Sequence, residues 1–100
     1  MGTYTFRSPL AHRLQAFLEI RRAFGRKGEA DRKILTYLDR FLVSELKPGQ
    51  TITPKIVERW IQDMSHLSVG TRINRLSLLR QFCVYQSQFD GRTCLVHRSF

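Results

Sequence analysis

Acidic residues, cysteine, proline and long apolar runs are all scarce in this chain of 100 residues. It contains eight Asp and Glu, two Cys and three Pro. Two cysteines are too few for a disulfide framework, so we expect Cys83 and Cys94 to be reduced thiols in a cytoplasmic protein. No apolar run approaches the length that spans a bilayer, and residues 1–10 lack the apolar segment of a signal peptide. These absences argue against a secreted or membrane-bound protein.

The chemically reactive residues also fail to form an enzyme motif or a metal-binding pattern. His12, His66 and His97 share no ligand spacing with the cysteines, so we expect no metal and no other cofactor. Neither a glycine-flanked nucleophile nor a pair of carboxylates at catalytic spacing is present. The glycines of GRKGEADRK, residues 25–33, follow a predicted helix rather than a strand, which argues against a phosphate-binding loop.

Basic residues are abundant and unevenly distributed. Seventeen Lys and Arg against eight Asp and Glu give a net charge of +9. Such a charge attracts polyanions, either nucleic acid or, less often, an anionic membrane surface. Residues 1–28 carry +5 (six basic, one acidic), residues 29–63 carry zero (six of each) and residues 64–100 carry +4 (five basic, one acidic). We therefore expect a one-sided basic surface of the kind that phosphate binding requires.

Apolar residues recur at spacings of three and four, which predicts four helices, no strand and a compact all-α domain. The first helix is predicted to start at Ser8-Pro9, to include Phe24 in its apolar stripe and to end at Gly25. The second covers about residues 29–46. The third starts at Thr53-Pro54 and places Trp60 in the core.

The fourth predicted helix, residues 68–89, is the longest. Ser68 is its expected cap, and Gly91 its expected left-handed stop. Its apolar rows include Ile73 and Phe89, which leaves Thr71, Arg72, Asn74, Arg75 and Ser77 facing outward. Residues 68–89 contain no acidic residue. Such a face suits an anion, although a solvated face with ordinary arginines is the simpler alternative.

The order of four segments resembles the N-terminal core-binding domain of the tyrosine recombinases, the family of phage and transposon integrases. The segments are SPLAHRLQAFLEIRRAFGRK, ILTYLDRFL, TITPKIVERWI and SVGTRINRLSLLRQFCVYQ, so the resemblance covers about residues 8–90. The family shows a basic RRA-x-G helix end, then L-x-x-LDRF, T-x-x-x-V-x-x-W and S-x-x-T-x-x-x-R-L-S-x-LRQF helices. These patterns match Arg21–Gly25, Leu35–Phe41, Thr53–Trp60 and Ser68–Phe82.

The resemblance implies a SAM-like orthogonal bundle of four helices over residues 1–91 that binds double-stranded DNA. It would be one arm of a site-specific recombinase, an integrase of a bacterial or phage mobile element, and other recombinase protomers would be its partners in the synaptic complex. The family's catalytic domain would follow, so we expect this chain to have no enzyme activity of its own. Residues 92–100 would begin the linker, although they lack the proline that the family's linker often has.

The resemblance and the charge distribution point to overlapping sets of DNA-binding residues. The family presents its second and fourth helices to the major groove, whereas the net charge lies on the first helix, the following loop and the fourth helix. One basic patch across the junction of the first two helices reconciles them. The predicted DNA-binding residues are Arg26, Lys27, Arg32, Lys33 and Thr36 near the second helix, and Thr71, Arg72, Asn74, Arg75, Ser77 and Arg80 on the fourth. Arg21 and Arg22 either flank this patch or only stabilise the end of their own helix.

Two other classes of protein share part of this pattern. A SAM-type protein-interaction module would have the fold but no need for a charge of +9. A helix-turn-helix transcription regulator would explain the charge, yet the turn between the third and fourth helices does not by itself identify one.

Overall fold

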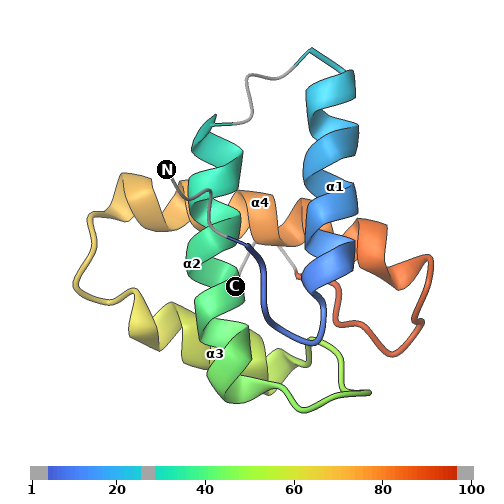
Figure 1. Cartoon of the computed structure of the whole chain (residues 1–100). Coiled ribbons are helices and arrows are strands. Elements are labelled where there is room, and N and C mark those ends of the chain that lie inside the picture. The colour runs from blue at the N-terminus through green and yellow to red at the C-terminus, as the bar shows by residue number, and fades with distance from the viewer. Residues whose placement is uncertain (1–4, 26–28, 97–100) are drawn as a thin grey trace. The chain divides into compact units, whose positions relative to one another are not determined.

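The computed structural model describes residues 5–25 and 29–96, and the chain divides into two units, Met1–Gln50 and Thr51–Phe100. The first unit contains α1 (Ala11–Ala23) and α2 (Glu29–Glu45), and the second contains α3 (Pro54–Asp63) and α4 (Val69–Ser87) (Figure 1). The described residues include no strand. The predicted all-α class with four helices is therefore confirmed, while the SAM-like arrangement of these helices remains a prediction.

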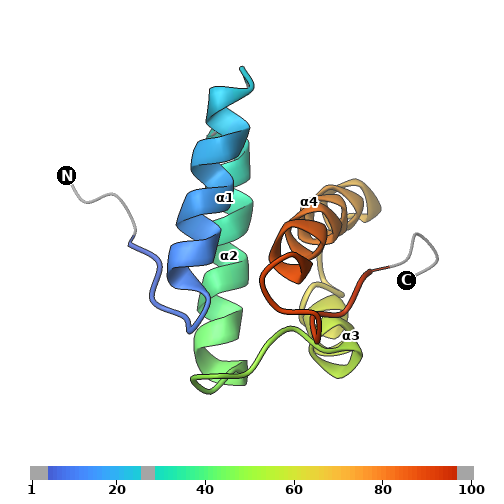
Figure 2. The same cartoon turned by 90° about the vertical axis from the view of Figure 1, so that its right-hand side faces the viewer.

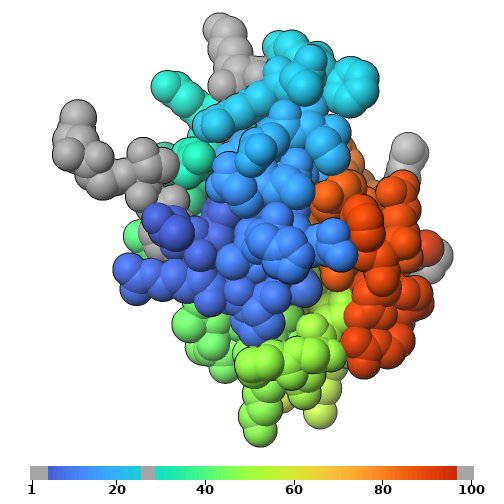
Figure 3. Space-filling view, turned by 45° about the vertical axis from the view of Figure 1, so that its right-hand side comes forward, coloured from blue at the N-terminus to red at the C-terminus, as the bar shows by residue number. Residues whose placement is uncertain are grey.

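In the first unit, α1 and α2 run antiparallel and contact each other (Figures 1 and 2). Their buried apolar side chains are mostly leucines: Leu14, Phe17, Leu18, Leu35, Leu38 and Leu42. The side of α1 that faces away from α2 carries exposed side chains (light blue in Figure 3). Gly25 ends α1 as predicted, with a φ of 85° that a residue without a Cβ adopts at little cost.

The start of α1 differs from the prediction. Its cap is Leu10, which makes no side-chain bond, and the helix begins at Ala11. Asp39 of α2 is fully buried, and its two carboxylate oxygens accept hydrogen bonds from the amides of Arg7 and Ser8, each at 2.9 Å. Ser8 is thereby held in the turn before the helix, where its Oγ accepts a 3.3 Å bond from the Leu10 amide. The predicted Ser8 cap is wrong because a carboxylate distant in sequence fixes this residue.

In the second unit, both predicted caps are confirmed. Thr53 Oγ1 accepts from the Ile56 amide at 3.3 Å, and Pro54 occupies the first turn of α3. Ser68 Oγ accepts from the Thr71 amide, also at 3.3 Å, at the start of α4. Trp60 is buried, as its place in the apolar stripe predicted.

The segment after α4 is fastened to the beginning of the second unit (Figure 2). The Cys94 amide donates to the Ile52 carbonyl at 2.8 Å, and the buried hydroxyls of Thr51 and Thr93 lie 2.8 Å apart. Val96 is also buried. Thr93 and Val96 are therefore packed against the second unit, whereas Leu95 between them is exposed.

Three residues at helix ends contradict the sequence prediction. Phe24 and Phe89 were placed in apolar stripes, but they are 84% and 50% exposed, because each lies just beyond the last residue of its helix. Gly91 does not have the expected left-handed conformation, since the positive-φ glycines are Gly25 and Gly49. The chain leaves α4 instead through Gln88, which keeps a right-handed conformation.

Both cysteines are free thiols in the second unit. Burial, together with a smaller effect of the neighbouring Cys94, raises the pKa of the Cys83 thiol to about 12. Cys83 is therefore a neutral, unreactive thiol at physiological pH.

Candidate nucleic-acid interface

A groove of about 310 Å³ runs along one face of α2. Its lining residues recur every three or four positions, which places them side by side on one helix face. They are Glu29, Arg32, Lys33, Thr36, Tyr37 and Arg40. Three of the predicted DNA-binding residues, Arg32, Lys33 and Thr36, are thus brought together, whereas Arg26 and Lys27 lie outside the described residues.

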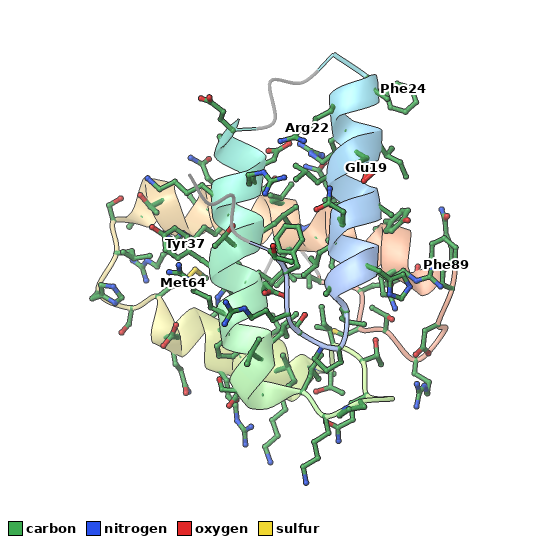
Figure 4. The ribbon with its side chains drawn as sticks, viewed as in Figure 1. Glu19, Arg22, Phe24, Tyr37, Met64 and Phe89 are labelled. Carbon is green, nitrogen blue, oxygen red and sulfur yellow. The ribbon has the colours of Figure 1, made fainter. Side chains whose placement is uncertain are left out.

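Tyr37 and Arg40 are lining residues that the predicted site did not include. Figure 4 shows Tyr37 on the side of α2 away from α1, and Arg40 is exposed. Tyr37 lies four positions after Lys33, and Arg40 lies four positions after Thr36. Residues four apart are neighbours on a helix, so this spacing could have added both to the predicted site. With Arg40 the groove has three cations against one carboxylate, Glu29, and it attracts anions.

Arg21 is committed to the packing of α1 and α2. Its Nε donates to the Asp31 carboxylate, and the guanidinium lies 5.5 Å from the centre of the Phe17 ring. The side chain is buried, and its charge is balanced by Asp31. Arg21 therefore joins α1 to α2, a role that differs from both roles considered for it, flanking the basic patch or stabilising the end of its own helix. Arg22, by contrast, is exposed near the end of α1 (Figure 4).

In the first half of α4, the residues that face the surface differ from those predicted. Ile73, expected in the core, is 60% exposed, and Asn74 is exposed as predicted. The expected outward residues Thr71, Arg72, Arg75 and Ser77 are half-buried.

The helical repeat explains the exchange. Arg72 and Arg75 each stand seven positions before a buried residue, Leu79 and Phe82. Seven residues are about two turns of an α-helix, so the two arginines continue the buried stripe toward the N-terminus of α4. The prediction that these side chains face fully outward is wrong, because the stripe of the second half fixes the rotation of the first.

Because they are half-buried, the side chains of Arg72 and Arg75 have fewer possible conformations than exposed side chains would have. A long basic side chain can pack its aliphatic stem on apolar neighbours and keep its charged head at the edge of the protein. In Arg72 the Nε atom is buried and has no hydrogen-bond acceptor among the residues that the structure describes. An unsatisfied buried donor is unfavourable by about 1–3 kcal/mol, so Arg72 lowers the stability of the fold at this position.

Arg80 has a contact with the segment that follows α4. Its Nε donates to the Val96 carbonyl at 3.2 Å, and the residue is half-buried. The side chain therefore fastens the C-terminal segment to α4, and part of its hydrogen-bonding capacity is used in doing so.

Comparison with protein-family models, curated protein sequences and solved structures finds no match to this chain. Within residues 5–25 and 29–96, no three His, Cys, Asp or Glu side chains are grouped so that they could hold a metal ion. None of the described helices combines the length and apolar character that crossing a membrane requires. The class of site thus rests on the geometry and charge of α2 and α4.

Proposed function

We propose that this chain binds duplex DNA, through the groove face of α2 and the N-terminal half of α4, as the DNA-binding arm of a site-specific recombinase. The observation that carries the DNA-binding part is the groove of α2, where Arg32, Lys33 and Arg40 line one helix face. Cations arranged in this way bind the phosphate backbone and so set the position of a protein on DNA.

The dimensions of the α2 face suit the major groove of B-DNA. The lining residues from Glu29 to Arg40 cover about 16 Å of helix, at 1.5 Å per residue. The major groove is about 12 Å wide and admits an α-helix. Side chains along one such face reach several neighbouring base pairs and the phosphates on either side.

The start of α4 supports the same function in the second unit. Residues 68–88 carry three arginines and no acidic residue, so no carboxylate of this helix opposes a phosphate. Arg72 lies in the first turns of α4, where free backbone amides also favour an anion. The positive charge of the arginine and the amides would both attract a phosphate there.

The recombinase part of the proposal rests on the order of the four sequence segments. A core-binding arm holds DNA while a separate catalytic domain cuts and joins the strands, so the activity of the complete protein and its synaptic partners belong to the proposal as well. Under this proposal the chain would bind DNA, and the reacting groups would belong to the catalytic domain.

Salt dependence of binding tests the phosphate contacts. The affinity for a fluorescently labelled duplex is measured between 50 and 200 mM salt, for wild type, Lys33→Ala and the matched control Lys47→Ala. Both lysines are exposed residues of the first unit, but only Lys33 lines the groove. We expect Lys33→Ala to weaken binding and to reduce the log–log salt slope by about 1, and Lys47→Ala to leave the slope unchanged. Equal effects of the two substitutions, or no binding by wild type, would contradict the proposal.

A further inference from the structure

The groove of α2 contains hydrogen-bond acceptors as well as cations. Thr36 donates its hydroxyl proton to the Arg32 carbonyl at 2.8 Å, so its Oγ1 offers only lone pairs to a ligand. The Glu29 carboxylate at the start of the groove is likewise an acceptor. Phosphate oxygens are themselves acceptors, so neither group can bind them. A surface that served phosphates alone would have no use for these two groups.

Glu29 differs from the other acidic residue in the first turn of α2. Asp31 is held by Arg21, which neutralises it inside the first unit. Glu29 is exposed, and it forms no ion pair with another described residue. Its carboxylate therefore stays within the groove, close in sequence to the cations Arg32 and Lys33.

Base edges in the major groove offer hydrogen-bond donors, which phosphates lack. Cytosine presents there only the N4 amino group, a donor, whereas adenine presents its N6 amino group beside the N7 acceptor, which repels a carboxylate. The guanine paired with that cytosine presents O6 and N7, both acceptors, which suit an arginine or a lysine. A carboxylate followed at three and four positions by two cations thus matches both halves of one C·G pair.

We propose that the α2 groove recognises base sequence, and that Glu29 selects cytosine by accepting a hydrogen bond from its N4 amino group, while Arg32 or Lys33 donates to the paired guanine. This inference rests on the proposed binding of duplex DNA. The simpler role for Glu29 is to favour the positive end of the α2 dipole, a role that affects stability and has no effect on sequence preference.

Selection from a library of random duplexes tests the inference. Bound duplexes are sequenced for wild type, Glu29→Gln and the control Glu58→Gln, which removes the same charge from an exposed position on α3. We expect wild type and Glu58→Gln to enrich a motif with a C·G pair that Glu29→Gln no longer requires. For duplexes that differ at that pair, discrimination should fall by about five-fold or more, the usual range for one base pair. Affinity of Glu29→Gln for unselected duplex should rise relative to Glu58→Gln, because a carboxylate leaves the groove.

The other outcomes are distinguishable. If wild type binds duplex DNA but enriches no motif, or if Glu29→Gln enriches the wild-type motif, the inference is overturned and the proposed DNA binding stands. If wild type binds no duplex, the proposed function fails together with the inference. Circular dichroism melts of the three proteins show whether a change in binding follows from a loss of folded protein.

Discussion

Helices α2 and α4 both carry cations of the candidate interface, but they hold them differently. On α2, Lys33 and Arg40 are exposed and line a groove. On α4, Arg72 and Arg75 are half-buried and continue the stripe that buries Leu79 and Phe82. Lys33 and Arg40 thus lie apart from the core, whereas Arg72 and Arg75 belong to the edge of it, and Arg32 of α2 is half-buried like them.

The difference separates two relations between folding and binding. An exposed cation contributes little to stability, so its substitution changes binding alone. A half-buried arginine packs its stem and desolvates its head, so its substitution changes both. We expect the two properties to be separable on α2 and coupled on α4.

The largest effect should come from Asp39, a residue of α2 that does not line the groove. Asp39→Ala leaves the buried amide of Ser8 and the amide of Arg7 without their acceptor, and should lower the free energy of unfolding by about 3 kcal/mol. Urea denaturation measures the loss, and Asp63→Ala, at an exposed position, should change it by less than about 0.5 kcal/mol. DNA affinity measured where Asp39→Ala is still folded should equal that of wild type. A loss of affinity under those conditions would show that stability and binding are coupled on α2 as well.

Arg72→Met tests the coupling on α4. Methionine keeps an apolar stem but removes the buried, unsatisfied Nε, so stability should rise by about 1 kcal/mol. DNA binding should weaken by about 1–3 kcal/mol if a base edge is contacted, and by less if only a phosphate is. Arg59→Met, which removes an equal charge from α3, should weaken binding far less. Equal weakening by the two substitutions would mean that the start of α4 acts only through the overall charge.

The glycines that follow α1 and α4 provide a smaller contrast between the two units. Gly25 of the first unit has a φ of 85°, whereas Gly91 of the second has no positive φ. Gly25→Ala should therefore lower stability by about 1 kcal/mol, and Gly91→Ala should change it by less than half of that. Thermal melts of the two variants measure the difference. Similar losses at both positions would contradict the right-handed exit from α4.

The smallest effect concerns the exposed pair of Asp90 and Arg92 in the second unit. Hydrogen bonds from the Arg92 side chain and backbone lower the pKa of the Asp90 carboxyl to about 2. A lowered pKa in the folded state means that the pair stabilises the fold above about pH 4, the ordinary value for Asp, and loses this contribution as the pH falls toward 2. NMR titration of the carboxyl group should give the low pKa, and Arg92→Ala should return it toward its ordinary value. An unchanged pKa in Arg92→Ala would show that Arg92 is not the cause.

The sequence predicted those features that neighbouring residues determine. The caps at Thr53 and Ser68 and the left-handed end of α1 at Gly25 each depend on a few consecutive residues. Helical periodicity likewise placed four helices and the buried Trp60. These features follow from local backbone chemistry, which a single sequence contains.

The remaining features depend on distant contacts. Nothing near Ser8 in the sequence indicates that Asp39, about thirty residues away, holds its amide. The rotation of the first half of α4 could not be predicted because apolar Ile73 and the long stem of Arg75 both suit a buried position. Only the burial of Leu79 and Phe82 decides between them. The groove could have been predicted more completely, since Arg40 follows Thr36 at helical spacing.

The contacts between residues 51–52 and 93–94 close the second unit into a ring of chain that contains α3 and α4. A protease that cuts one bond inside this ring, for example in the turn between the two helices, leaves two pieces that are still joined by hydrogen bonds. Such a nick therefore separates the pieces only after two hydrogen bonds have opened, the one from the Cys94 amide to the Ile52 carbonyl and the one between the hydroxyls of Thr51 and Thr93. The amide of Cys94, although it lies outside every helix, should accordingly exchange its proton with solvent as slowly as amides within one.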